Sequence, residues 1–215
     1  MAGAPDIIPV PGSPGRFLNT ATGQPTIIEE IFDDAVFDTI EIAAATNLSN
    51  TEYVFFDVTS NKKDQDAKFG QPKRIPASHM LKLAKIGLYV RQCYGGAKVD
   101  GIDTILCFEN GAYAFSLGKR LVTEGPAWRY PSGTGYYGVS TKNDFSLIGL
   151  GVPSPAAVPA LAEQHEISDQ MAINAALSFP TRAWAVAAGQ TIGTTTGGLF
   201  VTNTLQGVLR KPVGV

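Results

Sequence analysis

The sequence is short of charged residues, and this shortage bears on the partners the protein can have. Lys, Arg, Asp and Glu make up 17% of its 215 residues, whereas ordinary soluble domains carry about 25%. Such a composition is typical of a surface covered by neighbouring subunits, or of one rich in Thr, Ser, Asn and Gln. The net charge is −2 and no basic run exceeds two residues. A nucleic-acid-binding face normally shows a Lys/Arg stripe, so we expect no direct contact with nucleic acid.

Residues that could hold a metal or act as nucleophiles are also few. His79 and His165 lie far apart, without the thiols or carboxylates of a zinc site and without a Ser or Cys motif for hydrolysis. We therefore expect both to be structural, with no metal, no cofactor and no catalytic residue. Cys93 and Cys107 fall near the ends of two predicted strands. They could pair, but two small buried hydrophobic side chains are the preferred interpretation.

The sequence gives little support to two further classes, secreted or membrane-spanning proteins and glycosidases. The first residues, MAGAPDIIPVPG, lack the basic region and apolar core of a signal peptide, and no run approaches the ~20 apolar residues of a membrane-spanning helix. We expect synthesis in a cytoplasm. A glycosidase would need two facing carboxylates. Glu109 and Glu124 are conceivable candidates, but nothing in the sequence places them opposite one another.

The most regular stretch is Lys82–Cys93, which we predict to be a central strand. Ile86, Leu88 and Val90 alternate with Gly87, Tyr89 and Arg91, as in a strand with one buried face. A helix is the competing interpretation, because Leu81, Ala84 and Leu88 also have helical spacing. The β-branched and aromatic residues at its end and the following Gly95-Gly96 favour a strand.

Further short strands follow the same patterns. An Asn/Ser turn separates the first two, and Asn110-Gly111 is a strong hairpin signal. The predicted strands are 39–46, 52–59, 102–108, 112–117, 120–123, 143–150, 173–179, 182–188 and 199–209. Helical structure is expected only in Thr26–Asp38, where Thr26 and Glu29 fit a capping box, and in a turn within Glu163–Met171. These elements predict an all-β fold, most simply a single jelly-roll β-sandwich with long loops.

The domain organisation is an arm followed by one domain. Residues 1–25 are rich in Pro and Gly yet contain apolar side chains, which suits an extended arm that docks on its own domain or on a neighbour. Residues 26–215 form the sandwich. The segment 151–162 is apolar and broken by prolines, so we predict a subunit contact or a membrane-facing loop there. The candidate contact residues are Ile7, Ile8, Val10, Phe17, Val152, Pro153, Val158 and Leu161.

The long loop 124–142 combines glycines with Trp128, Tyr130, Tyr136 and Tyr137. Aromatic side chains on an exposed loop are used to stack on sugars or to contact subunits. They also pack long loops back onto their own sheet. The loop therefore leaves open a second function, that of a carbohydrate-binding or cell-surface β-sandwich module.

Three features together resemble the major capsid proteins of tailless icosahedral bacteriophages. They are the proline-rich arm, the strand run RIPASHMLKLAKIGLYV with long glycine/aromatic loops, and the final strand GGLFVTNTLQGVLRKP. The resemblance covers most of the chain and implies a single jelly roll. It further implies a structural virion protein without catalytic activity that assembles with itself into trimers or capsomers. Its other partners would be virion proteins, in a shell that sometimes overlies an internal membrane.

Overall fold

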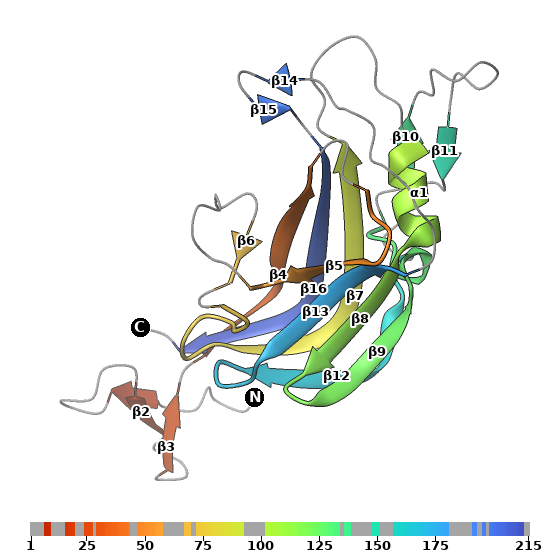
Figure 1. Ribbon diagram of the computed structural model, residues 1–215. Coiled ribbons are helices and arrows are strands. Elements are labelled where there is room, and N and C mark those ends of the chain that lie inside the picture. Colours follow the sequence, from red (N-terminus) through yellow and green to blue (C-terminus); the bar gives the residue numbers. More distant parts are fainter. Residues whose placement is uncertain are drawn as a thin grey trace.

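The computed structural model describes fourteen stretches of the chain, and the structural statements below concern these alone. They are residues 7–9, 16–19, 24–27, 29–43, 47–57, 67–69, 72–92, 102–133, 136–138, 148–150, 157–180, 191–192, 195–196 and 198–212. Within them, the protein is mostly β, with two antiparallel sheets packed face to face (Figure 1). The prediction of an all-β sandwich is confirmed at this level. None of the described helices is long and apolar enough to cross a membrane.

The larger sheet has the strand order β12-β7-β16-β4-β6, and the smaller one has the order β5-β13-β8-β9. The strands of the larger sheet are β4 (Glu29–Ile42), β6 (Ala67–Lys68), β7 (Met80–Gln92), β12 (Ala160–Ser168) and β16 (Leu199–Pro212). Those of the smaller sheet are β5 (Thr51–Phe55), β8 (Ala112–Leu117), β9 (Arg120–Pro126) and β13 (Ile173–Phe179). Strands β12 and β9 are thus the outer strands on the same side of the sandwich, where Figure 1 shows them near each other.

Apart from the short β6, the strands pair from the two ends of the chain towards its middle. The first, β4, pairs with the last, β16, and the second, β5, pairs with β13. The third, β7, pairs with β12, and β8 pairs with its sequence neighbour β9. Successive pairs alternate between the two sheets. The chain therefore folds as one long antiparallel ribbon that is wrapped around a common core.

The core lies between the sheets and is built from cross-strand rows of alternate residues. In the larger sheet, Val201 of β16 lies between Ile40 of β4 and Val90 of β7, and all three are buried. The smaller sheet contributes Phe115 and, from β13, a strict alternation of buried and half-buried positions. Burial of every second side chain is the expected consequence of two sheets sharing one apolar layer.

The predicted face of β7 is correct, and a bulge explains why the buried positions change parity along the strand. Ile86, Leu88 and Val90 are buried as predicted, but so are Leu81 and Leu83, which have the opposite parity. The register with β16 skips one residue of β7 between Leu83 and Lys85. This β-bulge returns the apolar side chains to the inner face. The strand nearest the middle of the larger sheet is β16 rather than β7, since β16 lies between β7 and β4.

Gly207 of β16 lies at this bulge. A Cβ atom built on Gly207 would fall 2.0 Å from the backbone oxygen of Lys82 on β7. No side chain can occupy that space without moving a backbone, so the bulge depends on glycine at this position.

The predicted strand 102–108 is wrong, because Ile102–Asn110 forms the helix α1. Its buried residues Thr104, Cys107 and Phe108 have the i, i+3, i+4 spacing of a helix with one covered face. Asn110-Gly111 is correspondingly not a hairpin turn. The Gly111 N–H donates to the Cys107 carbonyl at 3.0 Å, which continues the helical pattern by one residue before β8 begins.

The two predicted helical segments are strands instead. Residues 29–42 form β4, because they pair along their whole length with β16, from Glu29 opposite Pro212 to Ile42 opposite Leu199. Tertiary pairing here outweighs the local capping pattern. Residues 160–168 form β12, which pairs with β7. The predicted strands 39–46 and 52–59 fall in β4 and β5, which do not pair with each other, since they belong to different sheets.

Smaller elements lie at the two ends of the sandwich. A three-stranded sheet of β1 (Ile7–Pro9), β2 (Arg16–Asn19) and β3 (Gln24–Ile27) stands away from the sandwich at one end, near the C-terminus (Figure 1). At the opposite end lie α1 and two short hairpins (Figure 1). The hairpins are β10 (Tyr136–Gly138) with β11 (Ile148–Leu150), and β14 (Thr191–Ile192) with β15 (Thr195–Thr196).

Candidate functional site

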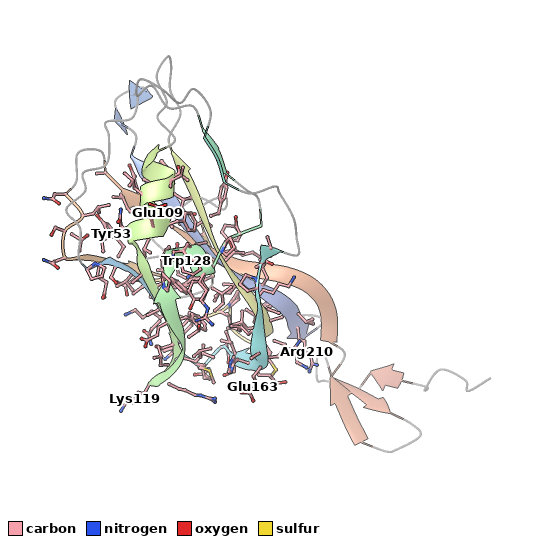
Figure 2. The ribbon with its side chains drawn as sticks, turned by 90° about the vertical axis from the view of Figure 1, so that its right-hand side faces the viewer. Tyr53, Glu109, Lys119, Trp128, Glu163 and Arg210 are labelled. Atoms are coloured by element: carbon pink, nitrogen blue, oxygen red, sulfur yellow. The ribbon has the colours of Figure 1, made fainter. Side chains whose placement is uncertain are left out.

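A cleft of about 390 Å³ lies between the outer strands β9 and β12. Figure 2 views the sandwich from this side, with Glu163 labelled on β12. The walls come from the two strands, and the segment around the 3₁₀ helix η1 (Ala127–Arg129) closes one end. The lining residues are Ile86, Arg120, Leu121, Val122, Thr123, Arg129, Tyr130, Pro159, Ala160, Leu161, Ala162, Glu163 and His165.

Both walls of the cleft are irregular strands. Ala160 of β12 is opposite Lys85 of β7, and the next paired residue, His165, is opposite Leu83. Residues 161–164 therefore face a single residue of β7 and have no register partner there. In β9, one residue is likewise inserted between Leu121 and Thr123 relative to β8. Such bulges redirect side chains at sheet edges, and here both sets of irregular residues line the same cleft.

The floor of the cleft belongs to the hydrophobic core. Tyr130 is only 4% exposed, its hydroxyl and that of Thr123 share a hydrogen bond of 2.8 Å, and its carbonyl accepts from the Leu88 N–H at 2.7 Å. Its ring centroid lies 4.9 Å from that of Tyr113. Tyr130 is thus held rigidly by three neighbouring elements, so the floor of the cleft is a fixed surface.

The charged residues of the cleft are mostly cationic. The lining includes two arginines, Arg120 and Arg129, one carboxylate, Glu163, and one imidazole ring, His165. Arg120 approaches Glu163 at 3.9 Å, but the two side chains are 72% and 76% exposed. Exposed pairs at this distance contribute about 0–1 kcal/mol. No side-chain hydrogen bond or ion pair joins Arg129 or His165 to another described residue.

A second polar cluster is enclosed between the sheets and has a structural role. Asp38 is fully buried on β4, and its Oδ2 accepts the backbone N–H of Phe56 at 2.6 Å, which ties the larger sheet to the end of β5. Asn203, opposite Asp38 on β16, donates to the hydroxyl of Tyr113 at 2.6 Å. The Oδ1 atom of Asn203 has no hydrogen-bond partner among the described residues. The Tyr113 hydroxyl thus accepts a hydrogen bond from a buried amide.

Burial also raises the pKa of Tyr113 well above its ordinary value of 10.0, although its hydrogen bond to Asn203 lowers it slightly. Because the folded pKa exceeds the unfolded one, stability is retained below pH 10 and falls as the unfolded chain begins to ionise.

We expect the free energy of unfolding to fall above about pH 10 with an added slope of about 1.4 kcal/mol per pH unit from this group. Tyr113→Phe should remove that slope, and should cost about 1–2 kcal/mol at pH 7. Urea unfolding at pH 7, 10 and 11 measures both effects. An identical alkaline slope in the variant would contradict this role.

The predicted contact residues separate into four groups. Ile7, Ile8 and Phe17 belong to β1 and β2 of the small sheet that stands away from the sandwich, and their contact with a neighbour stays a prediction. Val10, Val152 and Pro153 lie outside the described residues. Val158 is only 5% exposed, so the prediction that it contacts a neighbour is wrong for this conformation, because its own chain covers it. Leu161 is partly buried and lines the cleft.

The aromatic residues of the loop 124–142 do not form one exposed platform. Trp128 on η1 is 61% exposed and is labelled in Figure 2. Tyr130 is buried, so its predicted place in an exposed ligand surface is wrong, because the segment packs back onto β7. Tyr136 and Tyr137 belong to β10, opposite Leu150 and Gly149 of β11. The structure describes their backbone but not their side chains.

The remaining candidates from the sequence have simple positions. Cys107 is buried on α1, whereas Cys93 lies outside the described residues, so the structure does not test whether the two pair. Among the described residues, no group of three His, Cys, Asp or Glu side chains could hold a metal ion. The Nδ1–H of His79 donates one local hydrogen bond to the Ala77 carbonyl at 2.8 Å.

The cleft itself was not predicted from the sequence. Its members Arg120, Arg129 and His165 come from β9, η1 and β12, and no sequence spacing links them. They come together because β9 and β12 are the outer strands on the same side of the two packed sheets. In the comparisons with known proteins, no family model, no curated protein and no solved structure matches this chain.

Proposed function

We propose that this protein is a jelly-roll shell subunit: a structural virion protein that assembles with itself. The observation that carries the proposal is the order of strand pairing, β4 with β16, β5 with β13, β7 with β12 and β8 with β9. Pairs formed from the ends of the chain inwards and divided alternately between two sheets, with the short β6 as an addition to the larger one, support a jelly roll. This architecture is common in viral capsids, lectins and cupins.

Two features favour the shell subunit over the other uses of that architecture. The small sheet β1–β3 pairs within itself and extends away from the sandwich (Figure 1), which places it where a neighbouring subunit could be reached. At the opposite end, α1 and the hairpins β10–β11 and β14–β15 extend the sandwich lengthwise. An elongated wedge with an arm at one end suits a closed symmetric assembly of trimers or capsomers.

Assembly tests the proposal directly. We expect the purified chain to form symmetric oligomers in light scattering coupled to size exclusion, and ring- or shell-like particles in negative stain. Removal of residues 1–25 should reduce particle size while leaving the thermal transition of the sandwich within a few degrees of the full chain. The double variant Ile7→Ser/Ile8→Ser keeps the full chain length and changes only two residues of this segment, so it is the matched control for the truncation. A strictly monomeric full-length protein at high concentration would contradict the proposal.

A carbohydrate-binding module remains the second candidate. Among the loop aromatics whose side chains the structure describes, only Trp128 supports it, because Tyr130 is enclosed in the core. Glycan-array binding that disappears in Trp128→Ala would favour it over the shell subunit.

A further inference from the structure

We propose that the β9–β12 cleft binds a small organic molecule through a single oxyanion group, a phosphate or a carboxylate. This inference does not depend on the shell function, because it rests on the shape and charge of the cleft alone. Three observations carry it: two arginines at the rim, of which Arg129 has no ion-pair partner among the described residues, an apolar floor, and irregular strands on both walls.

The cations at the rim are available to a ligand. The Arg129 side chain lies over Gly125 of β9, where a Cβ atom would be 3.6 Å from Arg129 Cδ and 3.7 Å from the Tyr130 hydroxyl. This packing places the guanidinium group beside the cleft without an ion-pair partner among the described residues. Arg120 has only its long, exposed contact with Glu163. A guanidinium group matches the planar, two-oxygen edge of a carboxylate or phosphate, so a bound oxyanion would displace Glu163 at little cost.

The floor suits the uncharged body of such a ligand. Val122 and Leu161 are half-buried and provide apolar surface, whereas Ile86 and Tyr130 lie beneath it, 1% and 4% exposed. The volume of about 390 Å³ falls near the lower end of the roughly 300–1,000 Å³ seen for small-molecule sites. A ligand of about one sugar ring would fill it.

The walls add a reason to regard the cleft as a specific feature. Regular pairing along β12 would hold residues 161–164 against β7, whereas the observed register leaves them to line the cleft. The bulge in β9 faces them from the other sheet. Bulges next to binding sites commonly redirect side chains in this way.

Calorimetric titration of the full chain at low salt tests the inference, with four probes. Glucose 6-phosphate and glucuronate carry the two oxyanions on a sugar-sized body, inorganic phosphate lacks the body, and glucose lacks the charge. We expect one of the two charged sugars to bind, inorganic phosphate to bind at least tenfold more weakly than that sugar, and glucose not to bind detectably. Whichever charged sugar binds more tightly identifies the oxyanion.

Four variants localise the binding. Arg129→Gln should weaken it at least tenfold, and Arg120→Gln several-fold. Lys119→Gln is the matched control, because Lys119 is exposed at the β8–β9 turn (Figure 2) and does not line the cleft, yet the variant removes the same charge. Leu161→Trp fills the cleft without altering any charge and should also abolish binding. Thermal unfolding of each variant verifies that it is folded.

Each remaining outcome overturns the inference. Binding that Lys119→Gln weakens as much as Arg129→Gln would indicate general surface attraction. Inorganic phosphate bound as tightly as glucose 6-phosphate would show that the apolar floor contributes nothing. Failure of both charged sugars to bind at millimolar concentration would exclude the site. None of these results depends on oligomer size, so they stay separate from the test of the shell function.

Discussion

Replacement of Gly207 by valine is expected to lower the free energy of unfolding by about 3 kcal/mol, at the upper end of the cost of overpacking. The new Cβ would lie 2.0 Å from the Lys82 carbonyl oxygen, and that atom is backbone. Since no rotamer relieves the contact, β16 and β7 must separate at the bulge. These strands share the centre of the larger sheet, so the separation would also disturb the apolar rows on either side. Urea unfolding followed by circular dichroism measures the loss.

The matched control is Gly118→Ala at the β8–β9 turn. Gly118 has a positive φ of 59°, but a Cβ there would meet nothing within 4 Å. The control therefore carries only the cost of a left-handed backbone, about 1–2 kcal/mol. A Gly207→Val protein as stable as Gly118→Ala would show that the sheet has room at the bulge, and the close approach of β7 and β16 would then be wrong.

Asp38→Ala should also cost about 3 kcal/mol, for a different reason. The Asp38 carboxylate is the acceptor for the buried Phe56 N–H, and Phe56 itself has a positive φ of 61° at the point where β5 ends. Without the carboxylate, the N–H loses its partner between the sheets and the left-handed turn loses its support. Chemical denaturation at pH 7 measures the cost.

Two further substitutions identify the source of this effect. Asp38→Asn keeps an oxygen that can accept from Phe56, so we expect it to retain more stability than Asp38→Ala. Asp57→Ala removes a carboxylate from the same segment, but one that is half exposed and paired with Lys73 at 3.2 Å. Such surface pairs contribute about 0–1 kcal/mol. Equal losses in Asp38→Ala and Asp57→Ala would contradict a specific link between the sheets.

The fold class could be predicted because alternation along single strands is a local signal. The patterns at 82–93, 173–179 and 199–209 each identified a strand that the structure contains. The failures arose where local and distant signals conflict. The segment 29–38 resembles a capped helix by itself, and only its partner β16 makes it a strand. The segment 102–108 has residues that suit a strand, but its buried face follows helical spacing.

The cleft could not be predicted for the same physical reason. Its walls depend on bulges in β9 and β12, and a bulge is a property of two paired strands rather than of one sequence. The residue inserted in β9 is Val122, and no sequence signal around it predicts a bulge. Tyr130 illustrates the converse, because an aromatic residue in a glycine-rich loop gives no sign of whether it points outward or, as here, into the core.

The pairing of β4 with β16 has a consequence for how the chain reaches this structure. The hydrogen bond between Thr39 and Thr202 joins residues 163 positions apart. Strand β16 comes after all the other strands of the sandwich in the chain. Contacts between such distant residues close late and make folding slow. During synthesis, β4 and β7 lack the strand that lies between them until β16 has been made, so their apolar faces stay uncovered. We therefore expect nascent chains that lack residues 198–212 to bind chaperones or aggregate, while release of these residues allows the larger sheet to close.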